Sequence, residues 1–347
     1  MRVLVTGHLG YVGPSVVACL KEAGHHVTGL DAGYFSDCVD PTLGLTDVDT
    51  EFRIDIRDIG VQVLDRIDAI VHLGGLSNDP LGQLDPDLTT AINHSATVRL
   101  ARLAKDVGVG RFVFASSCSL YGASVDTSRP LDETASMRPV SAYALSKVAC
   151  ERDVGALAQR AFSPVFLRFA TAFGLSPRMR FDLVLANLTG WARTTGKIKV
   201  MSDGTPWRPL VHVKDMALAI SCALEAPSDA VSGRAFNIGR PENNVQICDL
   251  AEMVRRQIPA SRIEITGETG GDPRSYRVDF TRALRELPGF RPSWSIERGC
   301  EEVDRWIVDR NIDLQQFQSR SYIRLKQLQH LKEVGVLDGQ LRFRSER

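Results

Sequence analysis

Tyr143 and Lys147 are four positions apart in the segment 143–147 (YALSK), and Ser117 lies upstream at the end of an apolar run. Residues four apart share one face of a helix. A free tyrosine has a pKa of about 10, so it needs help to act as a base near neutrality, and an ammonium one turn away favours the phenolate. A serine hydroxyl can hold a substrate oxygen beside the tyrosine. The three residues are therefore candidates for proton transfer at an alcohol.

A glycine-rich stretch at residues 6–13 (TGHLGYVG) follows a short β-branched run and precedes an apolar-periodic segment that ends at Gly24. On such a strand-to-helix turn, glycines permit the sharp turn, a close backbone approach to a pyrophosphate and tight packing of the helix. A bare glycine triplet could be an ordinary βα turn, but the next apolar run ends in Asp31, where an acid can bind a ribose hydroxyl. The combination predicts dinucleotide binding. It favours NAD over NADP because Asp31 would repel a 2′-phosphate. With NAD present, Tyr143 would take the proton of an alcohol whose carbon gives up hydride.

Composition excludes several other classes of function. The 347 residues carry 42 Lys and Arg against 42 Asp and Glu, so no basic field favours nucleic acid or an anionic membrane. We expect the N-terminus to open directly into a strand without a signal peptide, and no apolar run reaches membrane-spanning length. The seven cysteines lack metal-ligand spacing. We expect free thiols, no metal site and a cytoplasmic location.

Short apolar strands alternate with helical segments over residues 1–173, which predicts an α/β fold with a doubly wound parallel sheet. The alternation weakens over residues 174–347, which we expect to form a smaller substrate-binding lobe. One strand of this half, near residues 235–239, is expected to return to the main sheet. The tail, residues 313–347, has partly helical spacing and is predicted to be a surface helix without a functional interpretation.

Taken in order, these motifs resemble the extended short-chain dehydrogenase/reductases, specifically the NAD-dependent epimerase/dehydratase family acting on nucleotide sugars. The resemblance covers roughly residues 1–310. The pieces that carry it are TGHLGYVG at 6–13, Asp31, Asp55-Ile56, HLGG at 72–75, SSCSLYG at 116–122, YALSK at 143–147, RPLVHV at 208–213 and the DPR that begins at Asp272.

The resemblance implies a role for each matching residue. In the family pattern, Ser117, Tyr143 and Lys147 are catalytic, with Ser116 and Ser119 as alternatives to Ser117. The implied NAD-binding residues are Gly7, Gly10, Tyr11, Val12 and Gly13 at the pyrophosphate, Asp31 at the ribose, Asp55 and Ile56 at the adenine, and Leu73, Gly74, Asn93, Tyr143 and Lys147 around the rest of the site. The implied substrate-binding residues are Ser117, Thr171 and Asn187, together with Arg208 and Arg274 as arginines that grip a diphosphate.

The leading hypothesis is an NAD-dependent nucleotide-sugar epimerase that works at C4 through a transient 4-keto sugar, with Tyr143 as the base. Alternatives within the family are a ketoreductase and a 3,5-epimerase, and a non-catalytic dinucleotide-binding regulator represents a different class. A 4,6-dehydratase is disfavoured because Cys118 and Ser119 stand where dehydratases resemble one another in having acidic residues. The resemblance also implies a homodimer that pairs the helices carrying Asn93 and Tyr143, through small faces such as Leu145, Ala149 and Ala156.

Overall fold

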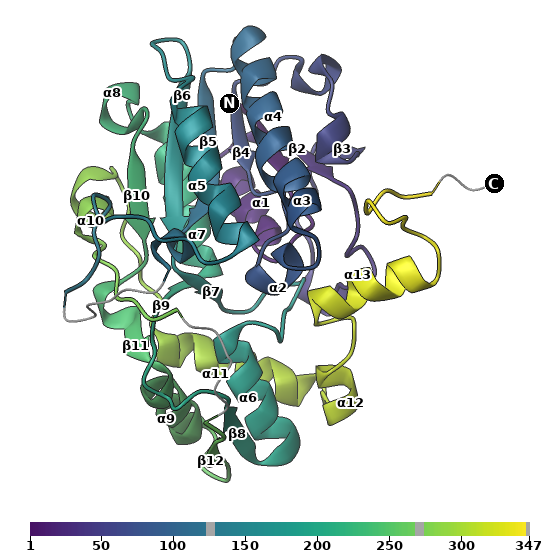
Figure 1. Ribbon diagram of the computed structural model, residues 1–347, viewed down its shortest axis with the longest axis vertical. Helices are drawn as coiled ribbons and strands as arrows, with labels where there is room; N and C mark the ends of the chain where they lie inside the picture. Colours follow the sequence, from purple (N-terminus) through teal and green to yellow (C-terminus); the bar gives the residue numbers. More distant parts are fainter. Residues whose placement is uncertain (123–128, 268–273, 345–347) are drawn as a thin grey trace.

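The computed structural model describes residues 1–122, 129–267 and 274–344. Its central element, within these ranges, is a seven-stranded parallel sheet in the order β10-β6-β5-β4-β1-β2-β3 (Figure 1). The order reverses between β1 and β4, and at such a reversal the connections leave in opposite directions and open a crevice at the carboxyl ends of the strands. The strands are β1 Arg2–Thr6, β2 His26–Asp31, β3 Thr50–Arg53, β4 Ala69–His72, β5 Arg111–Ser117, β6 Ser163–Phe169 and β10 Ala235–Ile238.

Helices cover both faces of the sheet because successive strand side chains point to opposite sides. Val3 and Val5 of β1 pack with helices α1 (Gly13–Glu22) and α7 (Val213–Glu225) on one face. Leu4 packs on the other face with α4 (Ala96–Asp106) and α5 (Ala142–Gly155). The predicted doubly wound α/β fold is confirmed, and the sheet is buried on both sides. Short segments join the α4 side, namely α2 (Asp79–Gly82), α3 (Pro86–Thr89) and a π-helical turn over Thr90–Ser95.

A smaller lobe lies below the carboxyl edge of the main sheet in Figure 1. Its described residues include a three-stranded sheet in the order β11-β9-β7 and a two-stranded sheet of β12 and β8. The strands are β7 Thr171–Phe173, β8 Lys197–Val200, β9 Trp207–His212, β11 Asn244–Gln246 and β12 Arg262–Ile265. Besides α7, the α-helices that the structure describes in this half of the chain are α6 Val184–Thr195, α8 Ser228–Val231, α9 Ile247–Gln257, α10 Thr281–Glu286, α11 Ile296–Asp309, α12 Leu314–Phe317 and α13 Arg324–Glu333. No helix of the described residues has the length and apolar character needed to cross a membrane.

The C-terminal tail differs from the surface helix predicted for it. Helix α13 buries Arg324, Gln327, Leu328 and Leu331, and it lies beside α2 at the edge of the crevice (Figure 1). Leu328 and Leu331 belong to the same apolar cluster as residues of the main sheet. The partly helical spacing of the tail therefore marks a packed face, which fixes the tail against the main domain.

A buried ion pair connects α5 to the sheet. Arg168 on β6 donates to Glu151 on α5, with Nη2 2.7 Å from Oε2, and both side chains are less than a tenth exposed. The Ser116 hydroxyl on β5 also donates to Glu151 Oε1, at 2.5 Å. The pair therefore fixes the helix that carries Tyr143 and Lys147 against the carboxyl ends of β5 and β6.

Replacing Glu151 by Ala should leave the Arg168 guanidinium buried without its carboxylate, lowering the free energy of unfolding by about 3–5 kcal/mol. Urea denaturation followed by circular dichroism measures the change. The double variant Glu151→Leu, Arg168→Met serves as the control, and it should lose less than the single variant because no charge remains buried. A loss below about 1 kcal/mol in Glu151→Ala would contradict this account of the pair.

Candidate functional site

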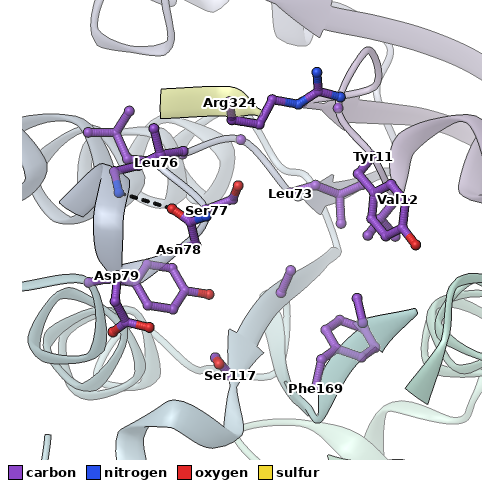
Figure 2. A pocket seen from close by; sticks show the side chains of 18 of the residues that line it. Tyr11, Val12, Leu73, Leu76, Ser77, Asn78, Asp79, Ser117, Phe169 and Arg324 are labelled. Atoms are coloured by element: carbon purple, nitrogen blue, oxygen red, sulfur yellow. Dashed lines mark hydrogen bonds between the residues drawn. The ribbon is translucent and has the colours of Figure 1, made fainter. Parts of the chain in front are cut away.

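A cavity of about 850 Å³ occupies the crevice where the strand order reverses. Its walls come from the ends of β1, β4 and β5, from α5 and from the smaller lobe, so residues far apart in the sequence meet there. Figure 2 shows side chains from several of these elements around the opening. The sequence-predicted residues on the wall are Gly7, Gly10, Tyr11, Val12, Gly13, Asp31, Asp55, Ile56, Leu73, Gly74, Ser117, Tyr143, Lys147, Thr171, Arg208 and Arg274.

The glycine turn brings two strand ends into close contact. Gly7 has a φ of +74°, and a Cβ at this position would lie 2.8 Å from the amide nitrogen of Gly74. A Cβ on Gly13 would lie 2.1 Å from the carbonyl oxygen of His8. Val12 is the N-cap of α1, and its side chain makes no hydrogen bond to the first turn of the helix. The backbone N–H groups at the N-terminus of α1 therefore stay open to an acceptor in the cavity. The turn therefore packs too tightly for side chains at Gly7 and Gly13, and it presents the N-terminus of α1 to the cavity as an anion cradle.

Asp31 closes the next side of the cavity from the end of β2. Its Oδ1 accepts from the Gly33 amide at 2.7 Å and its Oδ2 accepts from the Leu9 amide at 3.2 Å. The two bonds tie the carboxylate to the loop after β2 and to the glycine turn. Asp31 is thus held at the wall next to the anion cradle, the placement that a ribose-binding acid needs.

Asp55 is bound on its outer side by arginines. Arg57 donates Nη2 to Oδ2 at 2.6 Å and Nε to Oδ1 at 2.9 Å, and Arg342 of the tail lies 3.4 Å from Oδ2. Burial alone would raise the pKa of Asp55, but the hydrogen bonds from Arg57 outweigh it and hold the pKa below its usual value. Asp55 is therefore an anionic acceptor beside Ile56 in the cavity wall.

The proton-transfer candidates meet at the end of β5. Ser141, two residues before Tyr143, caps α5 by accepting from the Ala144 amide at 3.1 Å. Burial raises the pKa of Tyr143 to about 12, although a hydrogen bond with the Ser117 side chain acts in the opposite direction. Ser117 and Tyr143 both line the cavity, and the phenol is protonated near neutral pH in the absence of a ligand.

Lys147 lies on the same face of α5, but its ammonium turns toward the sheet. Nζ donates to the carbonyl oxygen of Ala115 at 2.7 Å and lies 5.5 Å from the centre of the Tyr143 ring. Burial lowers the pKa of Lys147 to about 8. After Ser117, the main groups that lower the pKa of Tyr143 are Arg274 and Arg180, which differs from the expectation that Lys147 would do so. The reason is the bond to Ala115, which directs the ammonium away from the phenol oxygen.

The smaller lobe contributes two arginines to the opposite wall. Arg274 Nη1 donates to Asp79 Oδ2 at 2.5 Å, and the Ser141 hydroxyl donates to the other oxygen of Asp79. Arg208 donates to the carbonyl oxygens of Trp207, at 2.9 Å, and of Arg274. Both arginines line the cavity, and the Arg208 guanidinium is bonded to the backbone of Arg274. Asp272 and Pro273 of the DPR motif lie outside the described residues.

Two predicted residues do not line the cavity. Asn93 lies in the π-helical turn, where its amide donates to the carbonyl oxygen of Leu76 at 3.0 Å and accepts from the Leu76 amide at 2.7 Å. It therefore braces the loop after β4 from outside the cavity wall. Asn187 donates to the carbonyl oxygen of Phe181 at 2.9 Å and holds the start of α6. Both amides are used within the protein.

The sequence reasoning missed several polar residues of the wall. Arg180 is buried and forms a forked pair with Asp182, with both N–O distances 2.9 Å, and it donates to Ser77 at 3.2 Å. The segment 178–182 (RMRFD) matched no motif, and only its density of charge next to an apolar run could have marked it. Arg324 of the tail also lines the cavity (Figure 2).

Cys118, the cysteine inside the SSCSLYG motif, points away from the cavity. Its Sγ donates to the carbonyl oxygen of Arg168 at 3.1 Å, and it does not belong to the wall. Burial raises the pKa of the Cys118 thiol well above its usual range. Ser119, by contrast, lines the cavity. The positions after Ser117 therefore present a hydroxyl, and no acid, to a ligand.

The family model described as NAD dependent epimerase/dehydratase family matches residues 3–239, more than half of the chain. The chain belongs to this family. The match begins in β1 and ends directly after β10, so it spans every strand of the main sheet. The anion cradle and the Ser117–Tyr143–Lys147 cluster lie inside it, whereas Arg274 and the tail lie beyond its end.

Individual members of the epimerase/dehydratase family align over most of the chain. The UDP-glucose 4-epimerase of Corynebacterium glutamicum is 29% identical, covering 88% of this chain and 95% of its own. The UDP-glucuronate 4-epimerase of Thermodesulfobacterium geofontis is 26% identical, covering 90% and 97%. Among solved structures, MoeE5 in complex with UDP-glucuronic acid and NAD is 28% identical, with a TM-score of 0.76 over 90% of this chain and 100% of its own.

The lowered pKa of Lys147 predicts a dependence of stability on pH. The folded pKa, about 8, lies below the usual 10.5, so between these values the unfolded chain binds more protons and stability gains as pH rises. Relative to Lys147→Met, the free energy of unfolding of the wild type should rise by roughly 2 kcal/mol between about pH 8 and pH 10. Urea titrations at each pH measure the difference. A difference that stays constant across this interval would show that the ammonium is not desolvated.

Proposed function

We propose that the protein is an NAD-dependent nucleotide-sugar epimerase that inverts C4 through a transient 4-keto sugar. The observation that carries the proposal is the sharing of one cavity by the glycine turn, the Ser117–Tyr143 pair and the two arginines of the smaller lobe. The related proteins named above are UDP-glucose and UDP-glucuronate 4-epimerases, which supports this class of substrate and reaction.

The residues of the cavity fit NAD. The diphosphate would lie against the first turn of α1, where Gly7 and Gly13 leave no room for a Cβ and the amides lack a side-chain cap. Asp31 would bind the adenosine ribose, and Asp55 and Ile56 would border the adenine. A 2′-phosphate would meet the carboxylate of Asp31, which supports NAD over NADP and argues against a ketoreductase that uses NADPH. Bound NAD supplies a hydride acceptor that returns the hydride within the same turnover.

Tyr143 is the proposed base for the C4 hydroxyl. Ser117 lines the same cavity and would hold the same sugar oxygen, so that the proton of the C4 hydroxyl could pass to the phenol oxygen of Tyr143. Because burial keeps the phenol protonated in the free protein, it needs a further positive charge to ionise, and the cationic nicotinamide ring is such a charge. Lys147, with a pKa of about 8, is mostly an ammonium near neutrality and can bind the nicotinamide ribose.

The substrate diphosphate is assigned to Arg208 and Arg274. We propose a functional division of the chain into residues 1–173, which bind the dinucleotide, and residues 174–347, which contribute these arginines. Thr171, at the junction, lines the cavity next to Phe169 and is a candidate sugar contact. The carboxylate of Asp79 now pairs with Arg274, so an incoming diphosphate would compete with it for the guanidinium.

Dehydration is not supported by the residues next to Ser117. Removing water across C5 and C6 requires a proton acceptor at C5 and a donor at the departing hydroxyl. Cys118 faces the core with its pKa raised, and Ser119 offers only a hydroxyl, which is too weak an acid or base to replace a carboxyl. The remaining machinery suffices for oxidation and re-reduction at one carbon.

The cellular location that we propose is the cytoplasm. The seven cysteines are free thiols, which suits a reducing compartment, where disulfides rarely form. Five of them are buried.

We propose that the protein forms a homodimer through α4 and α5. The outer face of α5 exposes Leu145, which is 56% accessible, together with Ala156, and Ala149 is half-buried on the same stripe. An exposed leucine followed along the stripe by two alanines allows the close approach of a second helix. The pairing of α4 and α5 with their copies would form a four-helix interface behind the catalytic face of α5.

Incubation with UDP-glucose or UDP-glucuronic acid in deuterated water should invert C4 without deuterium at C5 and without loss of water, as measured by NMR. Tyr143→Phe should still bind NAD but lose turnover by about a hundredfold or more, since the ring remains and the proton acceptor is gone. Retention of more than about a tenth of the wild-type rate would contradict the base role. A 4-keto-6-deoxy product would indicate a dehydratase, and deuterium at C3 or C5 without water loss would indicate a 3,5-epimerase.

Light scattering during size exclusion should give a dimer mass for the wild type at micromolar concentration and a monomer mass for Leu145→Glu, because a carboxylate would be buried in the helix pair. Leu314→Glu is the matched control, since Leu314 is also exposed, at 40%, but lies on α12. A monomeric wild type, or an equal effect of both substitutions, would contradict the proposed interface.

A further inference from the structure

The C-terminal residues 320–344, which we call the strap, lie beyond the part of the chain that matches the family model. The strap consists of α13 and a tight turn in which Leu337 pairs with Phe343. Leu328, Leu331, Leu337 and Leu341 are buried in the apolar cluster that covers the α4 side of the main sheet. This packing shows that the strap is a folded part of the main domain and that its position relative to the cavity is fixed.

The strap holds the adenosine side of the proposed NAD site from outside. Tyr34, which lines the cavity, donates its hydroxyl to the carbonyl oxygen of Leu341 at 2.6 Å. Gln327 donates to the carbonyl oxygen of Tyr34 at 3.2 Å, and the ring of Phe343 stacks on the Tyr34 ring with centres 5.7 Å apart. Arg342 reaches Asp55 at 3.4 Å. Two wall residues flanking the adenine position are therefore fixed by the strap.

The strap also places a buried positive charge in the cavity wall. Arg324 is 1% exposed, donates to the carbonyl oxygens of Arg178 at 2.8 Å and Ser321 at 3.5 Å, and lies over the ring of Phe35 at 4.6 Å. The buried Arg168 and Arg180 each pair with a carboxylate, whereas Arg324 has no such ion pair with any residue that the structure describes.

This arrangement makes Arg324 a site for an anionic ligand. Burying a guanidinium without a carboxylate is costly, and an anion bound in the cavity would offset the cost. Burial and the neighbouring Arg180 already lower the pKa of Arg324 to about 10, so it remains charged near neutrality. Figure 2 shows its side chain extending from α13 toward the side of the cavity where Tyr11, Val12 and Leu73 lie. That side contains the first turn of α1.

We propose that Arg324 binds the diphosphate of NAD and that the strap slows the exchange of the cofactor by closing the adenosine side of its site. The inference rests on the proposed NAD binding, and it adds Arg324, a residue outside the glycine turn, to the groups that bind the diphosphate. Guanidinium nitrogens on one side and helix amides on the other would enclose the diphosphate. An epimerase returns its hydride in each cycle, so slow exchange of the cofactor costs it no turnover.

The role of Arg324 is tested by calorimetric titration of the cofactor-free protein with NAD, ADP-ribose and adenosine. Arg324→Met should weaken NAD and ADP-ribose by about tenfold or more and leave adenosine unchanged, because adenosine lacks the diphosphate. Lys332→Ala, which removes an exposed cation from the same helix, should change none of the three. A merely structural role would weaken adenosine as well, and equal binding of ADP-ribose by Arg324→Met and wild type would overturn the proposal.

Circular dichroism and the melting temperature show whether Arg324→Met folds. If it does not fold, Arg324→Lys decides, since it keeps the charge but not the fork and should weaken NAD and ADP-ribose while leaving adenosine unchanged. A wild type that binds no NAD would refute the proposed function, whereas a wild type that binds NAD independently of Arg324 would refute only this inference.

The same proteins test the strap through the release rate of NAD, measured by a chase with excess unlabelled NAD. Phe343→Ala with Arg342→Ala removes two contacts to the adenosine side, and release should accelerate by about tenfold. An unchanged release rate in this variant would overturn the exchange part of the proposal.

Discussion

The close approach of β1 and β4 at their carboxyl ends is the constraint on which the site depends. Gly7 and Gly74 meet there with no room for a side chain between them, and the reversal of strand order opens the crevice at the same point. A larger residue at Gly7 would push apart the two strands that form the middle of the sheet. The anion cradle, the wall residue Asp31 and the end of β5 are all positioned relative to this contact. The geometry of the cavity therefore follows from a packing requirement of the sheet.

The sequence predicted the main sheet for two reasons. Its strands are short apolar runs buried on both faces, and the spacing of the glycines at residues 6–13 indicates a turn from a strand to a helix. Tyr143 and Lys147 were predicted for a similar reason, since residues four positions apart in a helix lie on the same face. Local spacing does not tell what a side chain bonds to, and this is why Asn93 was assigned to the cofactor although its amide is used by Leu76. Arg180 and Arg324 became visible only when distant segments met in the fold.

Charge inside the cavity is balanced mainly by pairs from the protein itself. Arg180 pairs with Asp182, and Arg274 pairs with Asp79, so each guanidinium faces the cavity with an anion already at hand. Such pairs keep arginines preorganised at low cost in the free protein, and a doubly charged diphosphate can take over one of them on binding. Tyr143 and Lys147 lack such compensation, and their pKa values shift in opposite directions through burial. Ligand binding thus affects two groups of residues. The paired arginines exchange a protein carboxylate for the ligand, and the buried Tyr143 and Lys147 have pKa values already shifted by desolvation.

Tyr11 connects the glycine turn to the start of the smaller lobe. Its hydroxyl donates to the carbonyl oxygen of Gly174 at 2.5 Å, and its own carbonyl oxygen accepts from the Ser176 hydroxyl at 2.7 Å. Both bonds are buried, and they cross the junction at which an interdomain hinge would have to bend. A rigid-body swing of the smaller lobe would break both bonds without water to replace them. Access to the cavity is therefore governed by local movements of its rim, because the two bonds of Tyr11 keep the two halves of the molecule in a fixed relative position.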